Sequence, residues 1–189
     1  MPTAAQFSLL TYNRIESPLG TLLAAAVELG VCLLEFEDAP GHKEEQLQAL
    51  ANELGCTPVE GEHPHLNQLH AELHAFFSGK SAVFGVPLVL VGTDFQKTVW
   101  QELLRIPYGT TRSYKQQSLA LNAPLAIRAV AGANGRNPIA VVVPCHRVIG
   151  GTGSLIGYGG GLWRKKWLLE LERDSGLAVP EVGKQLSLL

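Results

Sequence analysis

The stretch VVVPCHRVIG, residues 141–150, sets one cysteine between a proline and a histidine, directly after a run of β-branched apolar residues. The apolar run predicts a buried strand that ends near Pro144, because proline cannot donate a hydrogen bond to a neighbouring strand. Cys145 is then expected at the mouth of that strand, as a reactive group or as an inert core thiol. A nucleophilic thiol needs a nearby base or cation, and His146 and Arg147 are the closest candidates.

A carboxylate able to support the histidine lies in the last predicted helix, LWRKKWLLELERD, residues 162–174. Glu172 follows Leu168 and Leu169 at helical spacing, so its side chain is expected on the core face. A buried carboxylate needs a partner, and a histidine base works best when a carboxylate stabilises its charged form. From these residues alone, Glu172 is either that partner or an ordinary solvated charge at a helix end.

Two short helices are predicted side by side in the second half of the chain, at Tyr114–Leu121 and Pro124–Gly135. Only Asn122 and Ala123 separate them, and so tight a connection is typical of a helix-turn-helix. On the second helix, Arg128 stands alone, because the residues three, four and seven positions further on are alanine or glycine. Such a smooth helix can press against a sugar-phosphate backbone or enter a narrow groove. Close packing inside the protein would explain the small residues equally well.

The first half of the chain reads as a small antiparallel sheet with helices. Strands are expected at Leu9–Ile15, Leu22–Val27, Val31–Phe36 and Ala82–Val91, and helices at His42–Leu54 and Leu66–Phe77. Residues 55–65 read as a loop, and SPLG at 17–20 as a turn. A further helix is expected over residues 95–106, capped by Thr93 or Asp94.

Charge is distributed unevenly along the 189 residues. Residues 1–93 hold three Lys or Arg and eleven Asp or Glu, whereas residues 94–172 hold ten and four. The second segment is therefore the one expected to meet a polyanion. The alternative is that the two oppositely charged segments simply attract one another.

The cysteine pattern argues against disulfides and against a four-cysteine zinc site. The three cysteines, Cys32, Cys56 and Cys145, are odd in number and form no C-x-x-C pair, which favours a reducing compartment. The N-terminus lacks the features of a signal peptide, and no apolar run approaches the length of a membrane span. A soluble intracellular protein is expected.

Two weaker motifs remain open. His70 and His74 share a helix face in the stretch HAELH, but its glutamate is misplaced for the zinc-protease pattern HExxH. The glycine-rich residues 149–161 lack the Lys-Ser/Thr ending of a phosphate-binding loop. They indicate flexible backbone at the edge of a pocket.

Taken together, several stretches closely resemble the O6-alkylguanine-DNA alkyltransferases. The matching motifs are IPYG at 106–109, Ser113-Tyr114, Arg128-Ala129-Val130, Asn137-Pro138, PCHRVIG at 144–150 and GYGGG at 157–161. The match runs in the expected order from Phe95 to Glu172, and SPLG fits the more variable N-terminal part. PCHRV in this setting is highly specific, whereas each of the other motifs alone is not.

The resemblance implies an α+β fold in three parts. Residues 1–92 would form a small antiparallel-sheet, ribonuclease H-like domain. Residues 93–175 would form a mostly helical domain with the helix-turn-helix, which binds DNA and accepts the alkyl group. Residues 176–189 match nothing in the family and are expected to be a loosely ordered tail.

The resemblance also implies a chemistry that uses no metal and no diffusible cofactor. Cys145 would attack the alkyl carbon on O6 of guanine and keep the alkyl group as a thioether, in an irreversible reaction that occurs once per chain. O4-alkylthymine is a further substrate that the resemblance leaves open. His146 would take the thiol proton through a water, supported by Glu172, and Asn137 would brace the turn before the active-site strand.

The remaining implied roles concern double-stranded DNA, entered through the minor groove with the damaged base flipped out of the stack. Arg128 would fill the vacated space, and Tyr114 would crowd the target phosphate beside Lys115. The carbonyls of Cys145 and Val148 would accept from the guanine amino group.

The backbone at Tyr158 and Gly159 would face O6 of the flipped guanine. Gly159 stands where some relatives have serine, so only its backbone N–H is available. The zinc ligands of some animal relatives are not matched here.

Three other functions compete with this one. A lesion-flagging relative would lack the acceptor cysteine, which Cys145 argues against. A cysteine hydrolase would have no use for Arg128 and the helix-turn-helix. A transcription regulator would need a regulatory domain that this chain lacks. The expectation is a monomeric, cytoplasmic DNA-repair protein, with access to the nucleus if the source is a eukaryote.

Overall fold

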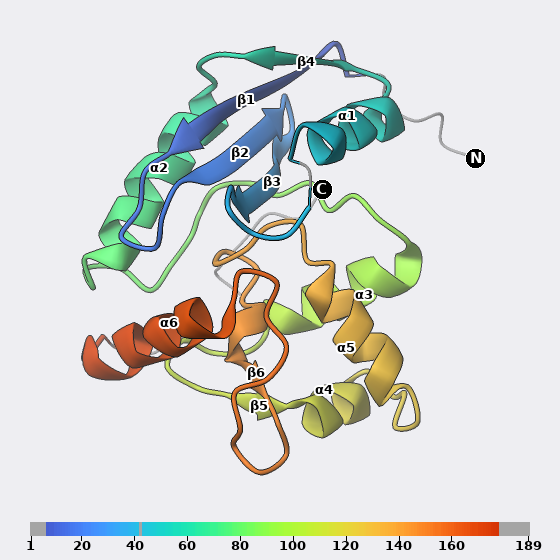
Figure 1. Ribbon diagram of the computed structural model, residues 1–189, viewed down its shortest axis with the longest axis vertical. Coiled ribbons are helices and arrows are strands. Elements are labelled where there is room, and N and C mark those ends of the chain that lie inside the picture. Colours follow the sequence, from blue (N-terminus) through green and yellow to red (C-terminus); the bar gives the residue numbers. More distant parts are fainter. Residues whose placement is uncertain (1–6, 42, 178–189) are drawn as a thin grey trace.

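The computed structural model describes residues 7–41 and 43–177. A sheet with two helices forms the N-terminal part, and four helices with a two-stranded ladder form the C-terminal part beneath it (Figure 1). The N-terminal elements are β1 (Leu9–Ile15), β2 (Leu22–Val27), β3 (Gly30–Phe36), α1 (Lys43–Leu54), β4 (Thr57–Glu60) and α2 (Pro64–Phe77). The C-terminal elements are α3 (Asp94–Leu103), β5 (Arg112–Ser113), α4 (Tyr114–Ala120), α5 (Ile127–Gly135), the 3-10 turn η1 (Cys145–Arg147), β6 (Val148–Ile149) and α6 (Leu162–Asp174).

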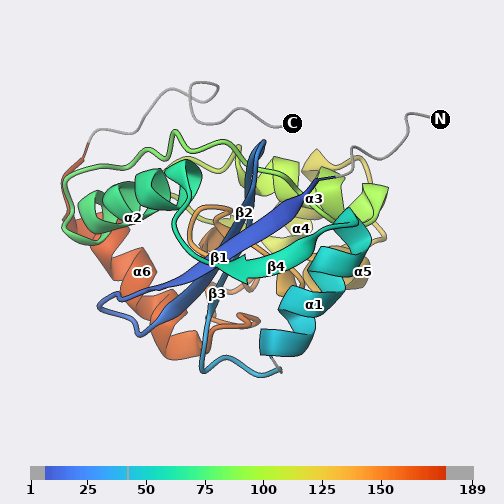
Figure 2. The same cartoon turned by 90° about the horizontal axis from the view of Figure 1, so that it is seen from above.

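The N-terminal sheet has the strand order β3-β2-β1-β4 and is mixed. β1, β2 and β3 are antiparallel, but β4 runs parallel to β1 and lies at the sheet edge, where Figure 2 shows it from above. The expected loop at 55–65 therefore contains a strand. Its four residues, TPVE, are too few to show alternation, and Pro58 is tolerated there because an edge strand needs fewer donors.

The strand expected at Ala82–Val91 is not present as a regular strand. Leu88 alone forms a bridge, with Val31 of β3. Upstream, the carboxylate of Glu72 on α2 accepts hydrogen bonds from the backbone N–H groups of Gly85 and Val86, at 3.0 and 3.1 Å. A side chain thus replaces the neighbouring strand as the hydrogen-bond partner, and the segment stays irregular although it is apolar.

The helices α4 and α5 pack against each other, but their connection is longer than expected. α5 begins at Ile127 rather than Pro124, so residues 121–126 join the two helices. Asn122 adopts a positive φ of 54° in this turn. Inside the pair, the amides of Gln117 and Asn134 exchange hydrogen bonds of 3.1 and 2.7 Å. These buried bonds fix how one helix lies against the other.

The apolar run that precedes Cys145 is a tight turn and not the expected strand. Only Ile139 forms a bridge, with Leu34 of β3. The backbone N–H groups of Val142 and Cys145 bond to carbonyls two residues earlier, and Val141 has a φ of 70°. Local bonds take the place of a ladder here, and the bridge to β3 anchors the turn to the N-terminal sheet.

Arg164 of α6 ties the two parts of the molecule together. Its guanidinium donates to the carboxylate of Asp38 at 2.7 Å and to the carbonyl of Leu19 at 2.8 Å. The site described below is therefore built on both halves of the chain. Among residues 7–41 and 43–177, no helix is long and apolar enough to cross a membrane. Most of the tail expected at 176–189 lies outside the described residues, which end at Leu177.

Candidate active site

Cys145 lies at the start of η1 and is 8% exposed. Its sulfur accepts a hydrogen bond from Nδ2 of Asn137 at 3.2 Å. The same amide nitrogen donates to the carbonyl of Val143 at 2.7 Å, and its Oδ1 accepts from the backbone N–H of Ile139 at 3.1 Å. One buried amide, able to donate and accept, therefore holds both the turn and the thiol.

Burial is the main influence on the thiol, and it raises the pKa of Cys145. The hydrogen bond from Asn137 and the positive charge of Lys165 act in the opposite direction and lower it. Because the net pKa shift is upward, the sulfur is held as a thiol in the resting protein. It therefore needs a proton acceptor before it can attack.

His146 and Glu172 form a fully buried pair beside the cysteine. Oε1 of Glu172 lies 2.7 Å from Nε2 of His146. The other ring nitrogen, Nδ1, is buried and has no hydrogen-bond partner among the described residues. If Nε2 carries the proton that bonds the carboxylate, Nδ1 presents a free lone pair. The histidine is therefore arranged to accept a proton at Nδ1.

Arg147 pairs with Glu172, a contact that the sequence did not predict. Its guanidinium binds Glu172 through Nε and Nη2 at 3.0 to 3.1 Å, and Nη1 donates to the carbonyl of Ile106 at 2.7 Å. The backbone N–H of Gly109 also donates to Oε2 of Glu172, at 2.9 Å. Arg147 thus pairs with the carboxylate of Glu172.

These contacts decide the charge state of the buried pair. Burial alone would favour the neutral acid of Glu172, but His146 and Arg147 outweigh it and lower its pKa to about 2. Burial also lowers the pKa of His146, although Glu172 partly compensates. At neutral pH the carboxylate is ionised and the imidazole is neutral, which is the form that a general base requires.

Lys165 is a buried member of the site that sequence reasoning missed. Its side chain is fully buried, and Nζ donates to the carbonyls of Val148, Ile156 and Gly157 at 2.5, 2.6 and 3.1 Å. Burial lowers the pKa of Lys165 to about 8. In the sequence this lysine stands between Arg164 and Lys166, so it reads as part of an ordinary charged helix face.

Tyr114, in the first turn of α4, contacts the glycine-rich loop. Its hydroxyl donates to the carbonyls of Ile156 and Gly157 at 3.3 and 3.2 Å. Gly157 has a φ of 60°, and a Cβ there would lie 2.5 Å from the tyrosine oxygen. Lys115 and Arg128 are both exposed, on α4 and α5.

The backbone of residues 148–159 partly matches its expected placement. The carbonyl of Val148 already accepts from Lys165, but a carbonyl has a second lone pair. The Tyr158 hydroxyl is buried without a hydrogen-bond partner in the described part of the chain. Gly159 is exposed and has room for a side chain, since a Cβ there would lie 3.8 Å from its nearest neighbouring atom.

Comparisons with known proteins identify the family to which this chain belongs. Residues 94–174 match the family model of the 6-O-methylguanine DNA methyltransferase DNA-binding domain. A methylated-DNA–protein-cysteine methyltransferase from Methanosarcina barkeri is 42% identical over 164 residues, which cover 87% of this chain and 98% of the relative. The chain belongs to the methylated-DNA–protein-cysteine methyltransferase family.

Two further members support the assignment. One from Mycobacterium leprae is 59% identical over 107 residues, which cover 57% of this chain and 65% of that relative. The crystal structure of Mycobacterium tuberculosis OGT in complex with DNA matches with a TM-score of 0.75 and 43% identity, covering 89% of this chain and 96% of that chain. The resemblance seen in the sequence to this group of proteins is confirmed.

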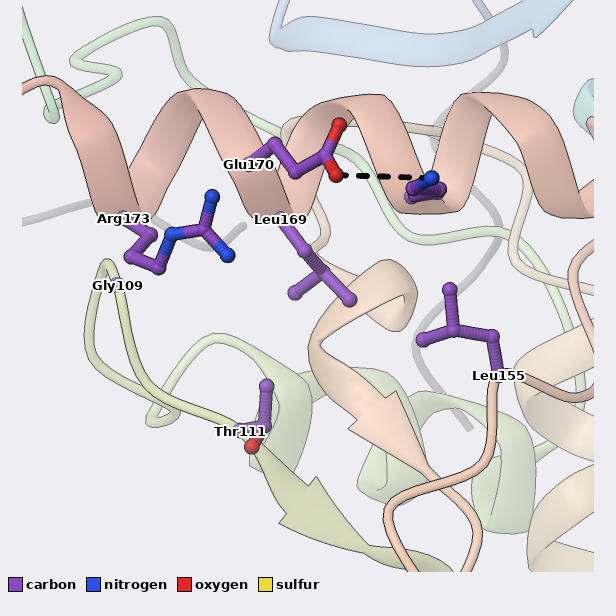
Figure 3. A pocket seen from close by; sticks show the side chains of 7 residues that line it. Gly109, Thr111, Leu155, Leu169, Glu170 and Arg173 are labelled. Carbon is purple, nitrogen blue, oxygen red and sulfur yellow. Dashed lines mark ion pairs between the residues drawn. The ribbon is translucent and has the colours of Figure 1, made fainter.

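One cavity of this methyltransferase family member lies away from the Cys145 thiol. It has a volume of about 340 Å³ and lies between α6, the turn at Gly109 and the glycine-rich loop. Leu169 of α6 and Leu155 of the glycine-rich loop line it, and Figure 3 shows both leucines beneath Glu170. Glu170 forms an ion pair with Lys166 at 3.8 Å. Cys145 does not line it.

The four histidines between residues 63 and 74 are not part of a metal-binding cluster in the described part of the chain. Within the described ranges, no three His, Cys, Asp or Glu side chains are grouped so as to hold a metal ion. His63 instead caps α2, where its Nδ1 accepts from the backbone N–H of His65. The i,i+4 pair of His70 and His74 has no third ligand beside it among these residues.

Proposed function

We propose that this protein repairs DNA by transferring the alkyl group of O6-alkylguanine to Cys145, once per chain and irreversibly. The observation that carries the proposal is the buried thiol, held by Asn137 and followed by the His146–Glu172 pair. This arrangement occurs in a chain whose relatives are named methylated-DNA–protein-cysteine methyltransferases. O4-alkylthymine is a second substrate to test.

The transfer is a direct displacement. The thiol proton passes to Nδ1 of His146 through a bridging water, and Glu172 stabilises the imidazolium that results. The sulfur then forms a bond to the alkyl carbon, and the bond from that carbon to O6 breaks. The electron pair leaves with O6, and guanine takes up a proton to regain its normal form. The stable thioether leaves no free thiol, which is why each chain reacts once.

Asn137 and Lys165 prepare the thiol for this step. Both lower the pKa of Cys145 against the opposing effect of burial. Asn137 also keeps the turn before the cysteine in one conformation through Val143 and Ile139. The two residues therefore act on the same atom, one through geometry and hydrogen bonding and the other through charge.

The partner is double-stranded DNA, bound through its minor groove by α4 and α5 as a helix-turn-helix. Arg128 fills the space left by the flipped base, Tyr114 crowds the target phosphate, and Lys115 contacts the backbone. Extrusion of the base costs a few kcal/mol, and less for a damaged base, which contributes to selectivity. Contacts of this kind read no sequence and suit repair at any position.

The flipped guanine is then read by backbone groups. The carbonyls of Cys145 and Val148 accept from its amino group, and the backbone at Tyr158 and Gly159 faces O6. Residues 1–92 and 93–175 are the two domains, the second of which binds DNA and accepts the alkyl group. The protein acts as a monomer and works where the DNA is, in the cytoplasm of a prokaryote or the nucleus of a eukaryote.

A single-turnover experiment tests this function. The protein, in molar excess, is mixed with a duplex that carries one radiolabelled O6-methylguanine. We expect label on the protein at no more than one per chain, also when the lesion is in excess. Cys145→Ala should lose the label, whereas the control Cys56→Ala should keep it, because Cys56 lies in the N-terminal part.

The other functions give different results in the same experiment. Tight binding of the duplex without transfer would indicate a protein that flags lesions. Release of a small labelled product over many cycles would indicate a cysteine hydrolase. Either result would overturn the proposal.

A further inference from the structure

Glu102 is a buried carboxylate that the proposed alkyl transfer does not use. It lies on α3 and is 5% exposed. Its Oε1 binds Nη1 of Arg112 at 2.6 Å, and its Oε2 binds Nη1 of Arg105 at 3.1 Å. The side chain of Arg105 is 68% exposed, whereas that of Arg112 is 31% exposed. Because water screens an exposed pair, the contact with Arg112 is expected to be the stronger one.

Arg112 begins the strand that joins the thiol turn to the helices of the proposed DNA contact. β5 pairs in parallel with β6, so that Arg112 lies opposite Val148 and Ser113 lies opposite Ile149. β6 follows directly on η1, which carries Cys145. Each strand is only two residues long, so few backbone hydrogen bonds hold the two in register. A side chain that binds Arg112 from outside the ladder therefore restrains where β5 lies.

β5 leads without a break into α4. Ser113 caps this helix: its hydroxyl accepts from the backbone N–H of Gln116 at 3.1 Å, and the Gln116 side chain accepts from the N–H of Ser113 at 2.7 Å. Tyr114 is the next residue, and its hydroxyl bonds to the glycine-rich loop. The cap makes the strand and the first helical turn one unit, so a shift of Arg112 would also move Tyr114.

Glu102 can act as an anchor because α3 is itself fixed. Trp100 of α3 is 2% exposed, and its indole N–H donates to the carbonyl of Ala133 on α5 at 2.8 Å. α3 also packs against η1. The carboxylate therefore extends from a helix that contacts both α5 and the thiol turn. Through Arg112 it sets the start of α4 relative to these two elements.

We propose that the Glu102–Arg112 ion pair positions Tyr114 for transfer from duplex DNA. The proposal rests on the alkyl transfer and on the contact of Tyr114 with the target phosphate proposed above. The pair does not touch the reacting atoms and acts through β5 and the first turn of α4. A small displacement of a group that orients a substrate is enough to slow a reaction strongly. Loss of the pair should therefore slow the reaction with duplex DNA and spare the reaction with a free base.

The test measures single-turnover transfer from O6-methylguanine in a duplex and from the free base O6-methylguanine, with the full chain in excess. Glu102→Gln and Arg112→Gln each remove the ion pair. We expect both to slow transfer from the duplex by a similar factor, on the order of tenfold or more. Transfer from the free base should keep the wild-type rate, which also shows that the variants are folded. Arg112→Lys should retain most of the duplex rate, because the pair uses a single nitrogen of the guanidinium.

Two further measurements separate positioning from a general loss of structure. Arg105→Gln is the matched control, because it breaks the exposed contact with the same carboxylate and should leave both rates unchanged. In a chain that already carries Tyr114→Ala, Arg112→Gln should slow the duplex reaction by no more than about twofold, because the residue that the pair positions is gone. Equal losses with and without Tyr114 would overturn the proposal. A matching loss on the free base would make the pair a structural contact only.

A direct contact of Arg112 with a DNA phosphate would give a different pattern. Glu102→Gln would then release Arg112 and tighten binding of the duplex, whereas Arg112→Gln would weaken it and reduce its salt dependence. Opposite changes in these two variants would overturn the positioning role, and so would wild-type duplex rates in both. If the wild type itself transfers no methyl group from the duplex, the proposed function fails, which is a separate result.

Discussion

Oε1 of Glu172 lies 2.7 Å from Nε2 of His146, and neither side chain is exposed to solvent. The same carboxylate also receives the guanidinium of Arg147 and the backbone N–H of Gly109. A fully buried carboxylate is stable only with such compensation. The pair therefore has two consequences, one for the stability of the fold and one for the protonation of His146.

The first prediction concerns the charge of this carboxylate. Glu172→Gln should reduce the free energy of unfolding by about 3 kcal/mol or more, because Arg147 is left as a buried charge without its counterion. The methyl-transfer rate should fall as well. The control is Glu170→Gln, whose ion pair with Lys166 is 3.8 Å long and exposed, and its effect should stay within about 0.5 kcal/mol. Urea unfolding measures both variants, and equal losses would contradict the prediction.

The second prediction concerns acid unfolding. Burial opposes ionisation of Glu172, yet its charged partners lower its pKa to about 2, below the ordinary 4.5. A depressed carboxyl pKa adds stability above pH 4.5, and this is lost as pH falls toward 2. Burial also lowers the pKa of His146 below 6.5, so the unfolded chain takes up a proton first and stability begins to fall below pH 6.5.

Urea unfolding across this pH range checks the prediction. Stability should decrease monotonically from neutral pH to pH 3 in the wild type. The part of the loss below pH 4.5 should be absent in Glu172→Gln. Burial lowers the pKa of His63 too, so His63 could also contribute to the loss of stability between pH 6.5 and pH 4.5. The variant His63→Gln measures that contribution and separates it from the contribution of His146. An unchanged acid profile in the Glu172 variant would show that other groups control the unfolding.

The third prediction concerns Asn137. Asn137→Asp keeps an acceptor for the backbone N–H of Ile139 but removes the donor to Val143 and to the sulfur. It also adds a negative charge beside the thiol, so the pKa of Cys145 should rise. Iodoacetamide labelling of Cys145 should shift to higher pH, and transfer at neutral pH should slow on the order of tenfold. Exposed Asn52→Asp should change neither measurement.

The fourth prediction concerns Lys165. Lys165→Met leaves the buried carbonyl of Val148 without its donor and removes one donor from the carbonyls of Ile156 and Gly157, which should cost about 1 to 3 kcal/mol of stability. It also removes a cation that lowers the pKa of the thiol, so labelling of Cys145 should move to higher pH. The neighbouring Lys166→Met removes an exposed charge and should do neither. A labelling profile that Lys165→Met does not shift would limit this lysine to a structural role.

The fifth prediction separates DNA handling from chemistry. Under the proposed function, Arg128→Ala should slow transfer from a lesion in duplex DNA on the order of 10- to 100-fold, because the variant lacks the side chain proposed to fill the space left by the base. Reaction with the free base O6-methylguanine should stay unchanged, since no base has to leave a stack. The control is Lys80→Ala, an exposed cation of the N-terminal part. Equal losses on both substrates would place Arg128 in the chemical step.

Much of the fold follows from local periodicity in the sequence. The strands at 9–15 and 22–27 and the helix that contains Glu172 lie where the sequence predicts them, and the helix that contains Arg128 begins three residues later than predicted. Apolar content alone was a poorer guide. The apolar runs before Cys145 and around Leu88 are buried but irregular. Their prolines cannot donate to a neighbouring strand, and the side chains of Asn137 and Glu72 bond to the backbone in place of such a strand.

The sequence by itself determined the resemblance carried by PCHRV, and through it the prediction that Cys145, His146 and Glu172 belong to one site; the helical spacing alone left Glu172 as either a partner or a solvated charge. Only the tertiary structure decided that Arg147 pairs with Glu172 and that Lys165 is buried against the carbonyls of Val148 and Ile156. The physical reason is the range of the interactions. Spacing records which side of its own element a residue faces, whereas a buried charge finds its partners on segments that are distant in the chain.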